Sequence, residues 1–270
     1  MLTLVPTPIG NMQDITLRAM DALSSADMLL CEDTRVTKKL LHILSSRYSL
    51  TCKDNQKFIS VHSHNESEFL NSIESSFFDE NIVYVSDAGM PGVSDPGAAL
   101  VRYCISHGIQ YDVLPGANAV LTSFVASGFT QTQFLFFGFL PHKGSDRETA
   151  LSKALFNGYV TVLYESPHRL QKLLKELQIK APQRELFVAK ELTKKFQRYF
   201  KGNADQILNQ LKETGIKGEW VVVIQSGESI NSNLSVEDIL SLDIPKKAAS
   251  KLIAKITGEN PKKCYQNLLL

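Results

Sequence analysis

The chain contains 270 residues, of which 43% are hydrophobic and 21% charged, and its formal net charge is +1. This composition is typical of a soluble globular protein with room for one large domain or two of ordinary size. No apolar stretch approaches the length of a membrane span, and the first residues lack the basic region and cleavage pattern of a signal peptide. We therefore expect a cytoplasmic protein with no membrane partner.

The four cysteines lie far apart in the chain, at positions 31, 52, 104 and 264, and form no C-x-x-C pair. This spacing predicts neither a disulfide framework nor a zinc site. No bound metal is expected.

The first 114 residues alternate between short apolar runs and amphipathic stretches. We predict strands near 2–5, 27–31, 58–61, 81–86 and 110–114. Helices are predicted between them, near 15–24, 35–44, 66–78 and 96–107. This β–α rhythm favours an N-terminal α/β domain, residues 1–114, whose parallel sheet is covered by helices on both faces.

The second α/β domain is predicted over residues 115–228. Its strands are expected at 134–137, 160–164, 185–189 and 219–224, with an extra paired strand near 196–201. Fewer helices separate these strands, near 147–156, 167–177 and 203–213, so a mixed sheet is favoured.

A Ser/Asn/Gly linker at 226–236 precedes a small helical tail, residues 235–270, with helices expected at 245–257 and 260–269. The last 27 residues hold six lysines against one glutamate, a net charge of +5, which leaves −4 on the other 243 residues. A local basic segment of this kind suits a polyanionic partner, and the alternative is a solvated helix face.

The segment Ser86–Gly97, SDAGMPGVSDPG, joins a predicted strand to a predicted helix and contains three glycines and two prolines. It matches neither of the familiar phosphate-binding loops. Asp95 is expected to cap the helix, with Pro96 at its first position. The segment is either a ligand-binding loop at the carboxyl edge of the sheet or a tight structural connection.

Other polar or Gly/Pro-rich segments also follow predicted strands, at 6–11, 31–35, 62–66 and 114–119. Because the carboxyl ends of parallel strands meet at one edge of a sheet, these segments are expected to line one cleft.

Ten short runs, taken in order, resemble the tetrapyrrole methylase superfamily over roughly residues 2 to 265. They are TPIGN at 7–11, DITLRA at 14–19, EDTR at 32–35, HNE at 64–66, SDAGMPGVSDPG at 86–97, LPGANA at 114–119, FLFFGFLP at 134–141, YESPHRL at 164–170, KELTK at 190–194 and GEWVVVI at 218–224. The resemblance implies two α/β domains with S-adenosylmethionine bound in the cleft between them. The EDTR and HNE runs are similar to the RNA-modifying branch, which methylates the ribose 2′-hydroxyl of a cytidine in small-subunit ribosomal RNA.

Carried over by position, the resemblance implies a set of cofactor-binding residues. They are Ile9, Gly10, Asp87, Ala88, Gly89, Gly92, Asn118, Ala119, Glu165 and Leu192. Glycine lets the main chain approach a ligand closely, which agrees with this placement.

Tetrapyrrole-specific members carry a Gly-Gly-Asp-Pro turn where this chain has Asp87-Ala88-Gly89-Met90, and this departure counts against a porphyrin precursor as substrate. Two alternatives stay open. One is a methyltransferase for tetrapyrroles or other small molecules, and the other is a non-catalytic rRNA-binding assembly factor.

Methyl transfer to a ribose hydroxyl needs a group that removes the hydroxyl proton. The candidates, with Arg35 as a group that orients a carboxylate or holds a phosphate, are Glu32, Asp33, Arg35, His64 and Glu66. Each also has a structural interpretation. Asp33 is a natural helix cap, Glu32 and Arg35 are a possible ion pair, and His64 with Asn65 can cap the next helix.

RNA contacts are expected from basic side chains, because phosphate contacts position a nucleic acid. The candidates are Arg18, Arg35, Lys38, Lys39, Lys143, Arg147, Arg169, Lys194, Lys195 and the tail lysines. Arg169 has an alternative role at the domain interface. The expected partner is small-subunit rRNA or the assembled small subunit, and the resemblance also implies a homodimer.

Overall fold

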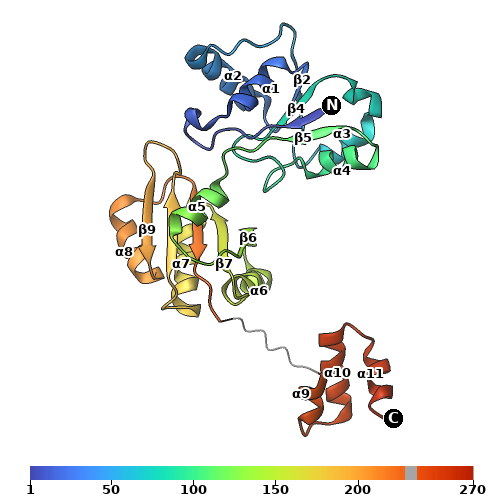
Figure 1. The fold of residues 1–270 in the computed structure, drawn as a ribbon. Helices are drawn as coiled ribbons and strands as arrows, with labels where there is room; N and C mark the ends of the chain where they lie inside the picture. The colour runs from blue at the N-terminus through green and yellow to red at the C-terminus, as the bar shows by residue number, and fades with distance from the viewer. Residues whose placement is uncertain (229–235, 270) are drawn as a thin grey trace. The chain divides into compact units, whose positions relative to one another are not determined.

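The computed structural model describes residues 1–228 and 236–269. The chain divides into two compact units. The first contains Met1–Leu155 and Tyr159–Gly227, and the second contains Phe156–Gly158 and the part of the chain from Glu228 onward. Figure 1 shows the elements of each unit. The domain boundaries expected from the sequence stay predictions.

The first unit begins with a sheet of five parallel strands in the order β3-β2-β4-β1-β5. Their bounds are β1 (Leu2–Leu4), β2 (Met28–Cys31), β3 (Lys57–Ser60), β4 (Ile82–Val85) and β5 (Tyr111–Val113). The central strands β1, β2 and β4 are buried along their whole length, which explains their uninterrupted apolar sequences.

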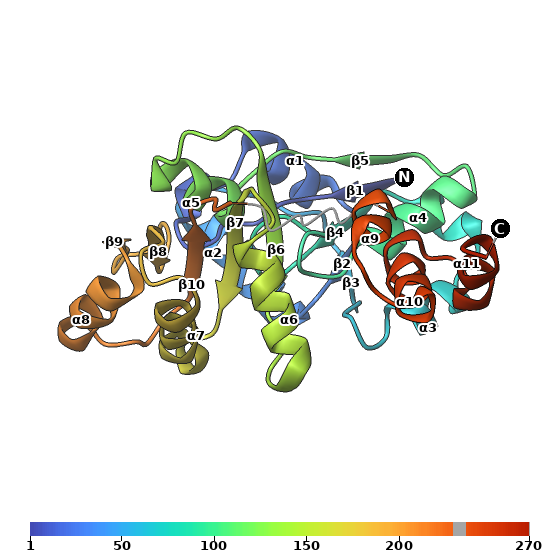
Figure 2. The ribbon, with the colours of Figure 1, turned by 90° about the horizontal axis from the view of Figure 1, so that it is seen from below.

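Helices cover both faces of this sheet, as Figures 1 and 2 show. Their bounds are α1 (Leu17–Ser25), α2 (Thr34–Tyr48), α3 (Glu66–Ser72) and α4 (Ala98–Ser106), with 3₁₀ turns at Met12–Asp14 and Ser75–Asp79. Leu23 and Leu44 anchor α1 and α2 in one core cluster, and Leu100 anchors α4 in the other. The expected parallel sheet with helices on both faces is confirmed.

The predicted length of one helix is wrong. The stretch 66–78 is not continuous, because Ile73 (φ −109°, ψ 151°) and Glu74 (φ −101°, ψ 165°) are extended. The chain therefore forms the short α3 and a separate 3₁₀ turn.

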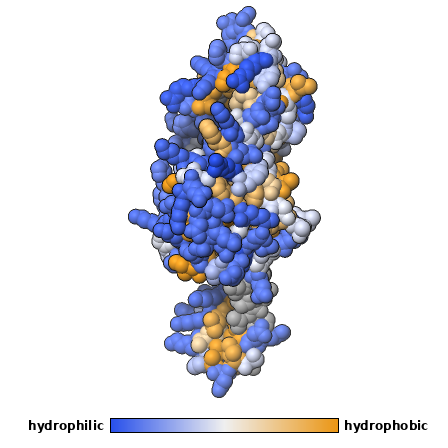
Figure 3. Space-filling view, turned by 90° about the vertical axis from the view of Figure 1, so that its left-hand side faces the viewer, coloured by the Kyte–Doolittle hydropathy of each residue, from blue (hydrophilic) through white to orange (hydrophobic). Residues whose placement is uncertain are grey.

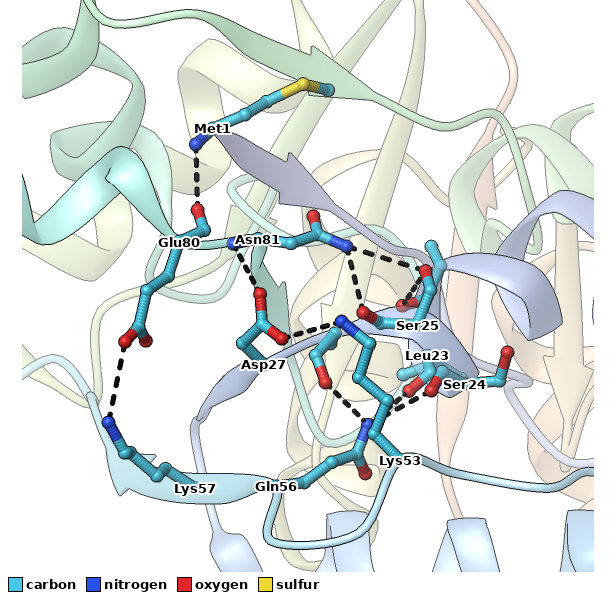
Figure 4. Close-up of polar contacts among 12 residues, drawn as sticks. Met1, Leu23, Ser24, Ser25, Asp27, Lys53, Gln56, Lys57, Glu80 and Asn81 are labelled. Atoms are coloured by element: carbon cyan, nitrogen blue, oxygen red, sulfur yellow. Dashed lines mark hydrogen bonds and ion pairs between the residues drawn. The ribbon is translucent and has the colours of Figure 1, made fainter.

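The amino ends of these strands are joined by side chains, as Figure 4 shows. Asp27 accepts a hydrogen bond from the main-chain N–H of Asn81 (3.0 Å) and pairs with Lys53 (2.6 Å). Lys57 pairs with Glu80 at 3.6 Å. The hydrogen bonds to Asp27 lower the pKa of its carboxyl. Hydrogen bonds and ion pairs therefore connect the segments at this edge. The loops at the opposite, carboxyl edge carry the candidate site.

A second, mixed sheet has the order β6-β7-β10-β8-β9. Its strands are β6 (Phe134–Phe139), β7 (Val160–Glu165), β8 (Leu186–Lys190), β9 (Arg198–Gly202) and β10 (Trp220–Ile224). The β6–β7 pair is parallel, while β10 is antiparallel to β7 and β8, and β9 is antiparallel to β8. The expected mixed sheet and the extra strand beside β8 are both observed.

The helices of this half of the first unit are α5 (Ala119–Ser127), α6 (Gly144–Leu155), α7 (Pro167–Lys180) and α8 (Ala204–Thr214). Helix α5 packs on the sheet through Val120, against Val221 and Val223. The sequence interpretation missed α5, because its apolar residues lie on several sides, with Leu121 and Val125 exposed. Its pattern therefore lacks the contrast between an apolar and a polar face.

The second unit contains α9 (Val236–Ser241), α10 (Lys246–Thr257) and α11 (Pro261–Asn267). They share a small core that includes Ile239, Ile253 and Cys264. Of the linker expected at 226–236, residues 229–235 lie outside the described residues, and residue 236 already belongs to α9. Among the described residues, no helix is long and apolar enough to cross a bilayer.

Candidate active site

The turn after β4 is shaped by left-handed glycines. Gly89 (φ +83°) and Gly92 (φ +82°) lie within it, and Gly97 (φ +129°) precedes α4 as its N-cap. A Cβ atom on Gly97 would make a tight contact of 3.0 Å with the ring of Tyr84, and the positive φ would strain any other residue. The expected helix start, with Asp95 as the cap and Pro96 as the first residue, is therefore wrong, because the chain keeps turning until Ala98. Asp95 therefore does not cap the helix and instead lines a cleft.

The loop after β1 is tied to this turn by the main chain. Thr7 and Gly89 exchange two hydrogen bonds of 3.0 Å each, and the Thr7 hydroxyl donates to the carbonyl of Ser86 at 3.3 Å. The first loop and the glycine turn therefore form one support.

The same first loop also meets the loop after β8. The main-chain N–H of Asn11 donates to the hydroxyl of Thr193 at 3.0 Å. A Cβ atom on Gly10 would lie 2.8 Å from that hydroxyl and 3.0 Å from the carbonyl oxygen of Leu192, so only glycine permits this approach.

These loops enclose a cleft of about 410 Å³. It is lined by Ile9, Ala88, Gly89, Met90, Val93, Ser94, Asp95, Asn118, Ala119, Phe139, Tyr164, Glu165, Ser166, Pro167, Leu192, Glu219, Trp220 and Val221. The lining residues come from loops after strands of both sheets and from the ends of β6, β7 and β10. The expected convergence of strand-end loops on one cleft is therefore seen, although the loops after β2 and β3 do not line it.

Seven of the ten residues that the sequence assigned to a cofactor lie in this lining: Ile9, Ala88, Gly89, Asn118, Ala119, Glu165 and Leu192. The other three lie outside it and shape its walls. Gly10 admits the loop after β8, Gly92 donates to the carbonyl of Pro96 (3.1 Å), and Asp87 contacts the loop after β2. Their roles in binding stay predictions.

The ionisable side chains of the lining are acidic except for Tyr164. Asp95, Glu165 and Glu219 are carboxylates, and no Lys, Arg or His of the described residues lines the cleft. Burial, followed by repulsion from Glu32, raises the pKa of Asp95 to about 6. Burial also raises the pKa of Tyr164 to about 12, so its hydroxyl stays protonated. From outside the lining, Arg169 pairs with Glu165 and Lys194 pairs with Glu219, so Asp95 is the lining carboxylate with no ion pair among the described residues.

Glu165 is fully buried and only partly satisfied. Its Oε1 accepts from the main-chain N–H of Ser166 (2.8 Å) and pairs with Nε of Arg169 (2.7 Å). Its Oε2 has no hydrogen-bond partner in the described part of the chain, and the guanidinium of Arg147 lies 3.6 Å away. A buried acceptor of this kind suits a hydrogen-bond donor on a ligand.

The candidates after β2 are engaged in other contacts. Asp33 caps α2 and holds Arg35 in a fork, with contacts of 2.6 and 3.0 Å. These hydrogen bonds lower the pKa of Asp33 to about 2, so it is a poor proton acceptor. Arg35 therefore pairs with Asp33, and the expected ion pair with Glu32 is wrong. Glu32 accepts from the main-chain N–H of Asp87 at 3.1 Å.

His64 and Glu66 do not line the cleft. Glu66 accepts from the main-chain N–H of Gly97 at 3.0 Å, so it supports the glycine turn. His64 is exposed, with its ring 5.9 Å from that of His62. Asn65 precedes α3 but makes no side-chain cap, because its Oδ1 accepts from the N–H of His62.

The basic side chains expected at the RNA surface fall into two groups. The exposed ones are Arg18, Arg35, Lys38, Lys39, Lys143 and Lys195. Arg147 is only 2% exposed and bonds Glu176 and the carbonyl of Pro141, so its assignment as an RNA contact is corrected. Arg169 is held by Glu165, and Lys194 pairs with Glu191 and Glu219.

Sequence reasoning did not assign several lining residues to the cleft, including Met90, Asp95, Phe139, Tyr164 and Trp220. Trp220 begins β10, which pairs antiparallel with β7 and β8, opposite Glu165 and Lys190. An antiparallel strand brings its first residue to the carboxyl edge of its neighbours. The predicted mixed sheet therefore already indicated that the first residue of an antiparallel strand, here Trp220, lies at the edge that carries the cleft.

Comparison with known proteins agrees with this geometry. The family model of the tetrapyrrole (corrin/porphyrin) methylases matches residues 1–208. The chain belongs to the tetrapyrrole methylase family, and the expected class of enzyme, a methyltransferase, is confirmed.

Within that family, the chain is similar to curated proteins named ribosomal RNA small subunit methyltransferase I. It is 46% identical to the one from Helicobacter pylori strain J99, with 100% of this chain and 98% of the relative covered. It is 44% identical to that of Campylobacter fetus, with both chains fully covered. It is 36% identical to that of Bacillus subtilis, with 94% and 88% covered.

Solved structures share the fold. The methyltransferase CobJ has a TM-score of 0.58 at 18% identity, with 84% of this chain and 94% of that chain covered. Uroporphyrin-III C-methyl transferase from Thermus thermophilus, complexed with S-adenyl homocysteine, has a TM-score of 0.52 at 18% identity, with 82% and 96% covered. At these identities the likeness concerns the fold.

Proposed function

We propose that this protein transfers a methyl group from S-adenosylmethionine to the ribose 2′-hydroxyl of a cytidine in small-subunit (16S) rRNA. The observation that carries the proposal is a cleft between two sheets, closed by a glycine turn, in which the charged lining residues that the structure describes are all carboxylates. The names of the relatives, at 36–46% identity over nearly the whole chain, support the substrate class.

The lining fits S-adenosylmethionine chemically. The ligand carries a sulfonium and an ammonium group, and the carboxylate of Asp95 places negative charge in the cleft. Glu165 and Glu219 add carboxylate oxygens as hydrogen-bond acceptors, with their charge balanced by Arg169 and Lys194. Ile9, Leu192 and Trp220 offer apolar walls of the kind that an adenine ring needs. The unpartnered Oε2 of Glu165 can accept a hydrogen bond from an ammonium or hydroxyl group.

When bound, the cofactor supplies the methyl group as an electrophile and leaves as S-adenosylhomocysteine. The chain must align the ribose oxygen with that methyl carbon in a water-poor site, and it must accept the hydroxyl proton. We assign the proton to the Asp95 carboxylate. It lies in the cleft, and its pKa of about 6 leaves it deprotonated yet more basic than an ordinary aspartate at neutral pH.

The RNA partner is held by exposed cations outside the cleft. Figure 3 shows the side of the molecule on which β9 and α8 lie, and this side is hydrophilic over much of the middle of the view. Contacts of Lys38, Lys39, Lys143 and Lys195 with phosphates would position the RNA without reading its sequence. The proposed compartment is the cytoplasm.

A homodimer is part of the proposal. Helix α5 exposes Leu121 and Val125, which are 52% and 76% exposed and one helical turn apart. The edge strand β5 exposes Val113 on the same unit. Light scattering on the purified protein tests this point, and Val125→Asp should give a monomer if this face is the interface.

Two measurements test the function. Calorimetry should detect binding of S-adenosylmethionine and S-adenosylhomocysteine. Transfer of a labelled methyl group should then be measured on naked 16S rRNA, assembled small subunits and uroporphyrinogen. Label on the ribose of RNA or subunits supports the proposal. Label on uroporphyrinogen alone makes it a small-molecule enzyme, and RNA binding without turnover makes it an assembly factor.

A further inference from the structure

The loop between β8 and β9 is a rigid hairpin connection with two left-handed residues that are not glycine. Glu191 has φ +51° and Thr193 has φ +63°. Such conformations are unfavourable for side-chain-bearing residues and persist where the surroundings hold them. Here Glu191 donates its N–H to the carbonyl of Glu219 (2.9 Å) and accepts the N–H of Glu219 through Oε1 (2.8 Å).

Hydrogen bonds inside the loop hold its remaining residues. The N–H of Thr193 donates to Oε1 of Gln197 (2.6 Å), and the N–H of Gln197 donates to the carbonyl of Lys194 (3.0 Å). The loop is therefore a fixed support that starts at the cleft, where Leu192 is part of the lining.

Phe196 projects from this support into solvent. Its side chain is 69% exposed, whereas the nearby Phe200 is only 4% exposed and packs near Trp220. Tyr199 is half-exposed, and its ring lies 5.1 Å from that of Phe187. Phe196 and Tyr199 therefore present two accessible aromatic rings on the same segment of the chain.

Cations flank the ring of Phe196. Lys195 and Arg198 are both exposed, and the ammonium of Lys195 lies 5.7 Å from the centroid of the Phe196 ring. Exposed aromatic rings interleaved with basic side chains suit a single-stranded nucleic acid, because the bases stack on the ring and the cations meet the phosphates.

The position of the ring relative to the cleft adds a geometric limit. Phe196 lies four positions after Leu192, so their Cα atoms lie at most about 14 Å apart. That span suits a nucleotide near the one whose ribose enters the cleft. A nucleotide presented to a cleft must leave its stack, and its neighbour then exposes a face for stacking.

We propose that Phe196 stacks on the base of an unpaired rRNA nucleotide close to the methylated one, with Lys195 and Arg198 contacting its phosphates. This inference rests on the proposed function and concerns how its substrate is held.

The test uses three substitutions of the full chain: Phe196→Ala, Phe196→Leu and Phe196→Trp. Binding to a 16S rRNA fragment that contains the methylated nucleotide is measured together with KM and kcat. If Phe196 stacks on a base, Phe196→Ala and Phe196→Leu should weaken RNA binding about 5- to 100-fold, whereas Phe196→Trp should retain it. The loss should appear mainly in KM for RNA. Tyr48→Ala removes another exposed aromatic ring, at the end of α2, and should have no effect.

Calorimetry with S-adenosylhomocysteine should be unchanged in all four variants, since Phe196 and Tyr48 lie outside the cleft lining. Thermal unfolding then checks that each variant is folded at the temperature of the assay. Full RNA affinity in Phe196→Ala overturns the inference. Full RNA affinity in Phe196→Leu also overturns it, because an aliphatic side chain cannot stack on a base. A third contrary result is a variant that changes the oligomeric state and keeps its RNA affinity. If the wild-type protein methylates no RNA at all, the proposed function itself fails.

Discussion

Glu32 and Asp87 join two loops from neighbouring strands of the first sheet. The main-chain N–H of Asp87 donates to Oε2 of Glu32, and Oδ1 of Asp87 accepts from the N–H of Asp33, both at 3.1 Å. Two carboxylates are thereby held close together beside the glycine turn. Burial, then repulsion from Glu32, raises the pKa of Asp87. The same two effects act on the pKa of Asp95.

Methyl transfer should depend on the ionisation of Asp95. Its pKa of about 6 means that the carboxylate form, which accepts the proton, disappears below that pH. We expect kcat/KM to be level above pH 7 and to fall about tenfold per pH unit below 6. Asp95→Asn should lower kcat about 10²- to 10⁴-fold and abolish this limb, while S-adenosylhomocysteine binding by calorimetry is retained. An unchanged profile in Asp95→Asn would exclude Asp95 as the acceptor.

Glu32→Gln tests whether the negative charge of Glu32 contributes to the raised pKa of Asp95. The amide oxygen of glutamine still accepts the N–H of Asp87, but the negative charge is gone. Because Glu32 contributes to the raised pKa of Asp95, we expect the acid limb of the pH–rate profile to move to lower pH, with kcat at pH 8 reduced less than tenfold. Asp54→Asn, at an exposed position, is the control for the removal of a charge. A limb that stays in place would contradict this coupling.

Arg147 should matter for stability and not for RNA binding. Its guanidinium is 2% exposed and donates to Glu176 at 2.8 and 3.0 Å. Arg147→Met leaves a buried carboxylate at Glu165 and a half-buried one at Glu176, so we expect a loss of about 3–5 kcal/mol in the free energy of unfolding. Denaturant unfolding measures this loss.

The double variant Arg147→Met/Glu176→Gln should recover part of that stability, since it removes a carboxylate whose remaining cationic partner is Lys172 at 3.9 Å. For Arg147→Met, the dependence of RNA affinity on salt, measured below the unfolding midpoint, should equal that of the wild type. A shallower dependence would show that Arg147 meets phosphate after all.

The lysines of the C-terminal unit should contribute to RNA binding through charge. We expect replacement of Lys246, Lys251, Lys255 and Lys262 by glutamine to weaken binding of 16S rRNA. The slope of log affinity against log salt should become shallower by about 0.7 for each phosphate that the variant no longer neutralises. Binding of S-adenosylhomocysteine should not change. Equal slopes for the variant and the wild type would assign these lysines to a solvated surface.

Much of the fold was readable from local patterns. The buried strands β1, β2 and β4 are visible as apolar runs, and the cap Asp33 marks the start of α2. Helix α5 was missed because tertiary contacts with the second sheet, and not an amphipathic pattern, select its buried side. The helix start at Ala98 was missed because Gly97 adopts a conformation that the capping rules do not anticipate.

The sequence alone determined the α/β class, the family and three of the loops that line the cleft, those after β1, β4 and β5, because these depend on local pattern and on residue identity. Only the tertiary structure decided which side chains reach the cleft. Glu66 and Glu32 accept hydrogen bonds from the main chain of Gly97 and Asp87, whereas Asp95 is left to line the cavity. The physical reason is that each carboxylate takes the partners that folding brings within about 3 Å. For Glu66 and Glu32 those partners lie on another loop, so nothing near either residue in the chain reveals them.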